Sequence, residues 1–198
     1  EYCIDTTNDN ACTTWVSTGT NTSVGLSALS NGTPYYWHVR AINGGGTTYA
    51  DGGSTVFWTF GTAPVAPGAF GRSAPSNGAT NQSTSPTLSW GSSSGAASYE
   101  YCIDTTNDNA CTTWVSTGTN TSVGLSALST SATYYWHVRA VNGGGTTYAN
   151  GVSGTYWNFS TVPPAPGSFA RSAPSSGVTG QTTNPTLSWG ASSGAASY

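Results

Sequence analysis

Residues 133–140 of this chain are Thr-Tyr-Tyr-Trp-His-Val-Arg-Ala, and residues 34–41 are Pro-Tyr-Tyr-Trp-His-Val-Arg-Ala. Successive side chains of a β-strand point to opposite faces of its sheet. In residues 133–140, one face would carry Tyr134, Trp136, Val138 and Ala140. This alternation with a period of two is typical of a strand that has one face against an apolar core. The stretch therefore predicts such a strand, with its Trp136 side facing inward.

Three further stretches between residues 68 and 162 show the same alternation. They are Thr87–Trp90 directly after Pro86, Tyr99–Asp104, and Tyr156–Phe159. Segments rich in Gly, Asn, Ser and Thr separate them, and no stretch has the 3.6-residue period of a helix. We therefore predict an all-β fold of immunoglobulin-like β-sandwiches with about seven strands each. The predicted core residues are Trp90, Tyr99, Tyr101, Ile103, Trp136, Val138, Trp157 and Phe159.

The sequence repeats itself with a period of 99 residues. Residues 1–99 and 100–198 align without a gap and are identical at 77 of 99 positions, and their first thirty residues are the same. This period is too long for a solenoid repeat and fits a small domain. The chain is therefore predicted to consist of similar domains in tandem.

Two proline-rich segments mark the boundaries of these domains. Residues 63–67 are Ala-Pro-Val-Ala-Pro, and residues 163–167 are Pro-Pro-Ala-Pro-Gly. Proline fixes φ and removes a backbone donor, so both segments are expected to be short, extended linkers. Because the linkers lie inside the 99-residue periods, residues 68–162 are predicted to form one complete module. Residues 1–62 would be the C-terminal part of a preceding module, and residues 168–198 the N-terminal part of a following one.

The order of the motifs resembles a fibronectin type III module. The motifs are Pro86-Thr87-Leu88-Ser89-Trp90, then Ala97 to Ile103, then Leu128 to Ala140, and finally Trp157 to Phe159. The spacing from Leu128 to Tyr134 is similar to the tyrosine corner of that family. The resemblance implies that the hydroxyls of Tyr134 and of its counterpart Tyr35 close the corner between two sheets. The cysteines depart from the animal pattern and are more similar to those of tandem modules in bacterial surface and secreted proteins.

Each copy holds two cysteines with eight residues between them, Cys3 and Cys12 in the first and Cys102 and Cys111 in the second. A disulfide within each pair would close a ring of ten residues across a hairpin, worth about 2.7 kcal/mol in chain entropy. A zinc site needs four ligands, whereas each module offers two sulfurs and one distant His. We predict two structural disulfides, and with them an oxidising, extracellular compartment.

The loop between the two cysteines is rich in oxygen ligands. In the second copy, the candidate calcium ligands are Asp104, Asn107 and Asp108. Their spacing does not follow the EF-hand pattern, and Asn and Asp are also the usual residues of tight turns. The pattern favours tight turns over a calcium site, and we predict no cofactor.

The two histidines, His38 and His137, raise the question of catalysis. A catalytic triad needs a nucleophile and an orienting acid around one imidazole, and the sequence offers no such constellation. Each histidine is predicted to lie on the strand face opposite the core. With the usual strand order, Glu100 and Asp104 face His137 and Arg139 across the sheet, which predicts cross-strand pairs. The protein is therefore not expected to be an enzyme.

Aromatic residues outside the predicted core are candidates for stacking against sugars. These are Tyr135, Tyr148 and Tyr156. Five Asn-x-Ser/Thr triplets are candidate glycosylation sites if the producing cell glycosylates, at Asn21, Asn31, Asn81, Asn120 and Asn158. Glycans are therefore candidate partners, either bound or attached.

The composition excludes several classes of function. Only 6% of the residues are charged, the chain has no Lys, and its net charge is −3, so it lacks the basic stripe that nucleic-acid binding requires. No apolar run approaches the length of a membrane span. Aromatic residues make up 12% of the chain, which is too much apolar surface for a disordered protein.

Two accounts explain the partial modules. Either the polypeptide is longer and this chain covers two periods of it, or residues 168–198 of one copy complete residues 1–62 of the next in a head-to-tail exchange. In both cases we predict a structural, extracellular protein whose tandem sandwiches form a filament, stalk or surface fibre. The alternative is an adhesion or carbohydrate-binding module of a secreted protein.

Overall fold

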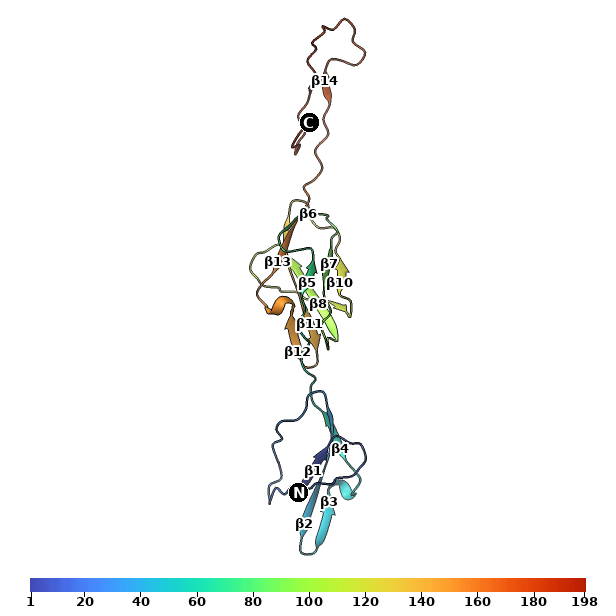
Figure 1. Cartoon of the computed structure of the whole chain (residues 1–198), viewed down its shortest axis with the longest axis vertical. Coiled ribbons are helices and arrows are strands. Elements are labelled where there is room, and N and C mark those ends of the chain that lie inside the picture. The colour runs from blue at the N-terminus through green and yellow to red at the C-terminus, as the bar shows by residue number, and fades with distance from the viewer.

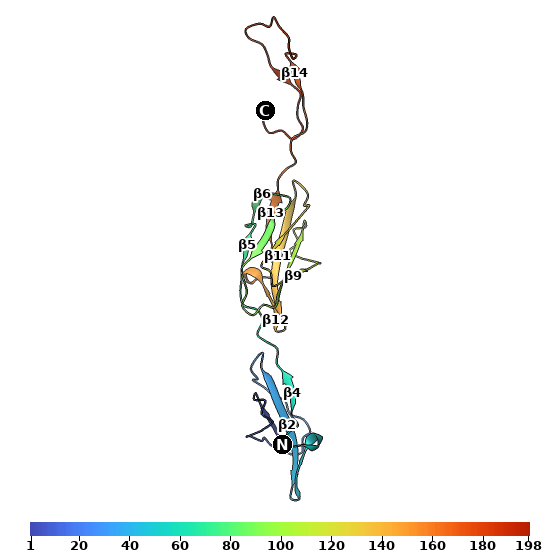
Figure 2. The ribbon, with the colours of Figure 1, turned by 90° about the vertical axis from the view of Figure 1, so that its right-hand side faces the viewer.

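The computed structural model describes all 198 residues and shows an elongated molecule (Figure 1). Three parts follow one another along its long axis, joined by two extended linkers (Figures 1 and 2). We call residues 1–62 the first part, residues 68–162 the middle module and residues 168–198 the last part. Apart from two 3-10 turns, every regular element is a strand. Neither turn has the length and apolar character that crossing a lipid bilayer demands.

The middle module consists of nine strand segments and one 3-10 turn. In chain order these are β5 (Arg72–Ala74), β6 (Ala79–Gln82), β7 (Thr87–Trp90), β8 (Ser98–Asp104), β9 (Val115–Gly118), β10 (Ser122–Gly124), β11 (Thr133–Asn142), β12 (Gly145–Tyr148), η2 (Ala149–Gly151) and β13 (Trp157–Thr161). One sheet has the order β10-β7-β5, and the other has the order β6-β13-β11-β8-β9 with β12 beside β11. The predicted all-β sandwich fold is confirmed.

The nine segments amount to seven strands. β12 and β13 pair with the two halves of β11 and together occupy one strand position. β5 and β6 follow each other in the chain, one in each sheet, and together they count as the first strand. β6 pairs with β13 in parallel, with Ala79 opposite Phe159. The first and last strands of the module therefore lie side by side and run in the same direction.

The core of the middle module lies between its two sheets. Its buried residues are Phe70, Leu88, Trp90, Tyr99, Trp136, Val138, Ala140, Ala149 and Phe159. Five of the predicted core residues are among them, while Tyr101, Ile103 and Trp157 are partly buried and pack against this cluster. The Trp136 face of β11 points inward because the alternation along residues 133–140 places every large apolar side chain on that face.

The first part is a single sheet with no second sheet over it. Its strands are β1 (Tyr2–Asp5), β2 (Pro34–Asn43), β3 (Gly46–Tyr49) and β4 (Trp58–Gly61), with η1 (Ala50–Gly52) after β3. β2 pairs with β1 on one side and with β3 and β4 on the other. The last part has only two short strands, β14 (Arg171–Ala173) and β15 (Ser188–Trp189), which pair with each other.

Identical sequence takes different structure in the two copies. Residues 115–118 and 122–124 are strands β9 and β10, whereas the same sequence at residues 16–25 forms one isolated bridge, between Tyr2 and Val16. β10 pairs with β7 in the middle module, and no counterpart of β7 lies beside residues 23–25. The partner strand therefore decides whether this sequence becomes a strand.

Candidate functional site

The linker between the first part and the middle module is held on both sides. On the first part, the Gly32 amide donates to the Ala63 carbonyl at 2.8 Å. On the middle module, Asn142 Nδ2 donates to the Val65 carbonyl at 2.8 Å. Thr147 Oγ1 donates to the Pro67 carbonyl at 2.6 Å. The linker carbonyls therefore contact the β11–β12 hairpin, and this joint fixes how one unit follows the next.

The glycines of the β11–β12 hairpin allow this close contact. A Cβ atom built on Gly144 would overlap the carbonyl oxygen of Pro64, and one on Gly143 would touch the Pro64 ring. The obstacle at Gly144 is backbone, so any larger residue there must push the linker away. The counterpart of Gly144 in the first part is Gly45, whose Cβ would approach only the side chain of Asn43.

The far end of each linker is bound in the same way in both copies. The Gly68 amide donates to the Ser94 carbonyl at 2.8 Å, and the Gly167 amide donates to the Ser193 carbonyl at 2.9 Å. Ser93 and Ser192 donate their hydroxyls to the carbonyls of Gly68 and Gly167. These anchoring contacts recur after 99 residues, whereas the contacts of Asn142 and Thr147 are made to the first linker alone.

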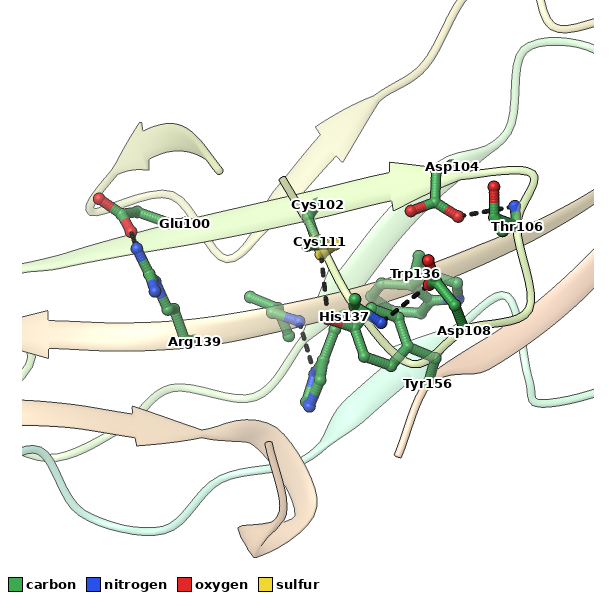
Figure 3. Close-up of a disulfide and its surroundings, with 12 residues drawn as sticks. Glu100, Cys102, Asp104, Thr106, Asp108, Cys111, Trp136, His137, Arg139 and Tyr156 are labelled. Carbon is green, nitrogen blue, oxygen red and sulfur yellow. Dashed lines mark hydrogen bonds and ion pairs between the residues drawn. A yellow bond between two sulfur atoms is a disulfide. The ribbon is translucent and has the colours of Figure 1, made fainter. Parts of the chain in front are cut away.

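The two predicted disulfides are formed, Cys3 with Cys12 and Cys102 with Cys111. Cys3 and Cys102 are buried on β1 and β8, on the sheet face opposite the core. Figure 3 shows the second disulfide beside β11, close to His137 and Tyr156. Each bond ties its Asn- and Asp-rich loop to the sheet.

Removing the second disulfide is expected to destabilise the middle module. Replacing Cys102 and Cys111 together by Ser frees a ten-residue ring, which costs about 2.7 kcal/mol. Hydrogen exchange of the β11 amides measures this loss for the middle module alone, since residues 133–142 differ in sequence from residues 34–43. The matched change of Cys3 and Cys12 to Ser should leave the β11 amides unaffected. Equal protection in both variants would contradict the prediction.

His137 is fully buried on the face of β11 that is opposite the core. Trp114, Tyr148 and Tyr156 pack around its ring. Nδ1 accepts from the Val138 amide at 2.9 Å, so Nε2 carries the proton and donates to the Val152 carbonyl at 2.7 Å. Burial lowers the pKa of His137 to about 4, and the nearby Arg72 charge acts in the same direction. The imidazole is therefore a neutral part of a second, smaller core.

One of the two expected cross-strand carboxylates pairs as predicted. Glu100 lies opposite Arg139, and their side chains form an ion pair at 2.6 Å (Figure 3). The Arg139 guanidinium also lies 4.2 Å from the centre of the Trp114 ring. The predicted pairing of Asp104 with His137 or Arg139 is wrong, because Asp104 lies opposite Tyr135. Cys102 occupies the position opposite His137, because the register brings the disulfide to that point.

Both tyrosine corners are present in the structure. Tyr134 Oη accepts from the Ser129 amide at 2.9 Å, and Tyr35 Oη accepts from the Ser30 amide at 2.8 Å. Each bond joins the start of a long strand to the loop before it, as the fibronectin resemblance implied. The fold is fibronectin type III-like.

Comparison with known proteins finds likenesses among solved structures. No protein-family model matches the chain, and no curated protein matches it in sequence. The solved structure of chicken CNTN1 FN1–FN3 domains is similar, with 19% sequence identity and a TM-score of 0.44. The match covers 68% of this chain and 45% of that one, so the chain spans less than half the length of that structure. At this TM-score the likeness carries no argument about the chain.

The candidate calcium loop uses its carboxylates within the loop itself. Asp104 Oδ1 accepts from the Thr106 amide at 2.9 Å (Figure 3), and Asp108 Oδ1 accepts from the Ala110 amide at 2.9 Å. Asn107 is exposed. The chain has no group of three or more His, Cys, Asp or Glu side chains suited to a metal ion. These contacts are those of Asx turns.

The candidate sugar-stacking residues and glycosylation sites differ in exposure. Tyr148 and Tyr156 pack against His137, and Tyr135 is half-buried on β11. The exposed glycosylation candidates are Asn21, Asn31, Asn81 and Asn120, whereas Asn158 is half-buried in β13. None of the three tyrosines is fully exposed.

Sequence reasoning missed one buried charge, Arg72 of β5. Its Nε donates to Asn150 Oδ1 at 3.0 Å, and its Nη1 donates to the Thr155 carbonyl at 2.8 Å. Burial lowers the pKa of Arg72 to about 10. One guanidinium nitrogen, Nη2, has no acceptor. No local pattern marks this residue, because its partners Asn150 and Thr155 lie about 80 residues further along the chain.

Proposed function

We propose that this chain is a structural, non-enzymatic segment of an extracellular stalk or fibre. The joint between the first linker and the β11–β12 hairpin carries this proposal, because the same contacts at each later joint would make every unit follow the preceding one in the same way. Contacts that repeat every 99 residues give the same orientation at each step, and equal steps build a regular linear array. The stalk would hold whatever it carries at a fixed distance from its base.

The chemistry of the units supports an extracellular setting. Two disulfides persist in an oxidising compartment. The chain has four Arg and no Lys, so trypsin-like proteases would find few points of attack on an exposed polymer. A sandwich held together by cross-strand hydrogen bonds and a disulfide suits a structural role better than a catalytic one.

Electron microscopy of native material tests the proposal most directly. We expect thin, unbranched fibres with a repeat along the axis that corresponds to one module and its linker. Dispersed globular particles in material isolated from the producing cell surface would contradict the stalk.

Replacing Gly144 by Ala is expected to loosen the joint without unfolding the middle module. The new Cβ must displace the Pro64 backbone, so the first part should leave the molecular axis. Small-angle X-ray scattering of the monomeric fraction should then give a smaller radius of gyration. The stability of the middle module should change by less than about 0.5 kcal/mol.

The control for this prediction is Gly45→Ala at the matching position of the first part. No linker lies against Gly45 in the chain, so its scattering should equal that of the unchanged protein. If Gly144→Ala also scatters like the unchanged protein, the hairpin does not hold the linker.

A further inference from the structure

The first part has an apolar groove where a second sheet would lie. The groove has a volume of about 580 Å³ and includes Ile4, Val24, Leu26, Trp37, Trp58 and Phe60. Phe60 is 36% exposed, whereas its counterpart Phe159 in the middle module is fully buried. An apolar surface of this kind in water favours binding of a partner that covers it.

The middle module shows what covers the same surface there. β5 and β7 form the second sheet together with β10, and Leu88 and Trp90 of β7 lie in the core with Phe70 and Tyr99. These four residues are close to fully buried. The occupant that fits the groove is therefore a chain segment with the pattern of residues 68–99.

The last part carries that pattern with its apolar residues uncovered. The counterparts of the four core residues are Phe169, Leu187, Trp189 and Tyr198, and all four are exposed. Leu187 is 67% exposed, whereas Leu88 is fully buried. The chain therefore contains both an open groove and the segment that would fill it.

The last part cannot reach the groove of its own chain. The two parts lie at opposite ends of the elongated molecule, with the middle module between them (Figure 1). The linker from residue 163 to residue 167 has five residues and spans at most about 18 Å when extended. A second copy of the chain carries a segment with this pattern and can supply it.

Charge complementarity at one position favours this partner. In the middle module, Nε of Arg72 donates to the amide oxygen of Asn150, and Nη2 has no acceptor. On the first part, the counterpart of Asn150 is Asp51, in a smaller pocket that it shares with Trp37 and Trp58 of the groove. The counterpart of Arg72 on the last part is Arg171. A carboxylate offers a second oxygen, so it can accept from Nε and Nη2 together. Both Asp51 and Arg171 are exposed in the single chain.

We propose that residues 163–198 of a second copy dock on the first part and complete its sandwich. The proposal deepens the proposed function, on which it rests, by naming the partner as another copy of this chain. Leu187 would lie opposite Val24, as Leu88 lies opposite Val123, and Arg171 would form an ion pair with Asp51. The contact joins two different surfaces, so it leaves a free groove and a free last part for further copies.

Sedimentation velocity of the 198-residue chain over a wide range of concentration tests this assembly. We expect the average mass to rise steadily with concentration and to pass beyond the dimer. Leu187→Ala should weaken association about a hundredfold, as expected for a truncated core leucine. The control is Val152→Ala, an exposed apolar residue away from the groove, whose counterpart Gly53 is smaller still. It should associate like the unchanged chain.

A charge exchange tests the partner's position in the groove. Asp51→Arg and Arg171→Asp should each weaken association, and the chain that carries both changes should recover most of the loss. No recovery would overturn the predicted pairing. A chain that stays monomeric at every concentration, or that stops at the dimer, would overturn the inference. Neither result bears on the proposed stalk, which native fibres and the Gly144 variant test separately.

Discussion

Replacing Leu88 by Ala is expected to cost the middle module about 3–4 kcal/mol of unfolding free energy. Leu88 is fully buried on β7, between the two sheets. Truncation removes apolar burial and leaves a cavity among aromatic rings that have little freedom to move inward. Hydrogen exchange of the β11 amides gives the loss directly, because these amides open with the core.

The matched control is Leu187→Ala, which is the same change one period later. Leu187 is exposed and belongs to the last part, so the β11 amides of the middle module should exchange as in the unchanged chain. Similar losses in both variants would mean that the core does not form between these two sheets.

Lowering the pH from 7 to 4 is expected to cost the middle module about 3 kcal/mol. His137 in the folded module has a pKa near 4, whereas an unfolded His has a pKa of about 6.5. Between pH 6.5 and pH 4, the unfolded chain therefore binds a proton at His137 that the folded module does not bind. The stability is complete above pH 6.5, falls as the pH drops toward 4, and levels off below that.

The structure gives two reasons why protonation of His137 is unfavourable in the folded module. Protonated Nδ1 would face the Val138 amide donor, and the ring would become a buried cation close to the Arg72 charge, packed against Trp114, Tyr148 and Tyr156. His137→Gln can still donate to the Val152 carbonyl but does not titrate. Thermal unfolding of this variant between pH 7 and pH 4 should lack the 3 kcal/mol decline. The same decline in both proteins would assign the effect to other groups.

The fold was predictable because strand patterning is local. The alternation along residues 133–140 places Trp136 inward, and the Glu100–Arg139 pair follows from the usual strand order. The cysteine spacing also predicts its own bonds, because nothing else in the module competes for the sulfurs. These inferences need only neighbouring residues or one adjacent strand.

The parts that were missed depend on segments that are distant in the sequence. Asn142 and Gly144 contact the linker about 80 residues earlier, and no local pattern marks them as a joint. His137 is buried because Trp114, Tyr148 and Tyr156 converge on it, Tyr148 from the end of β12 and the other two from loops. Arg72 is buried for the same reason. Sequence periodicity assigns a face to a side chain but does not say what covers that face.

The parallel pairing of β6 with β13 determines how the middle module would resist tension along the proposed fibre. The chain enters the module at one end and leaves it at the other (Figures 1 and 2), so a pull draws these two strands in opposite directions along their own axes. Their hydrogen bonds are then sheared together instead of opening one at a time. In the proposed fibre, the bonds between these two strands would share the load, so that the force needed to separate the strands would be the sum over all of them.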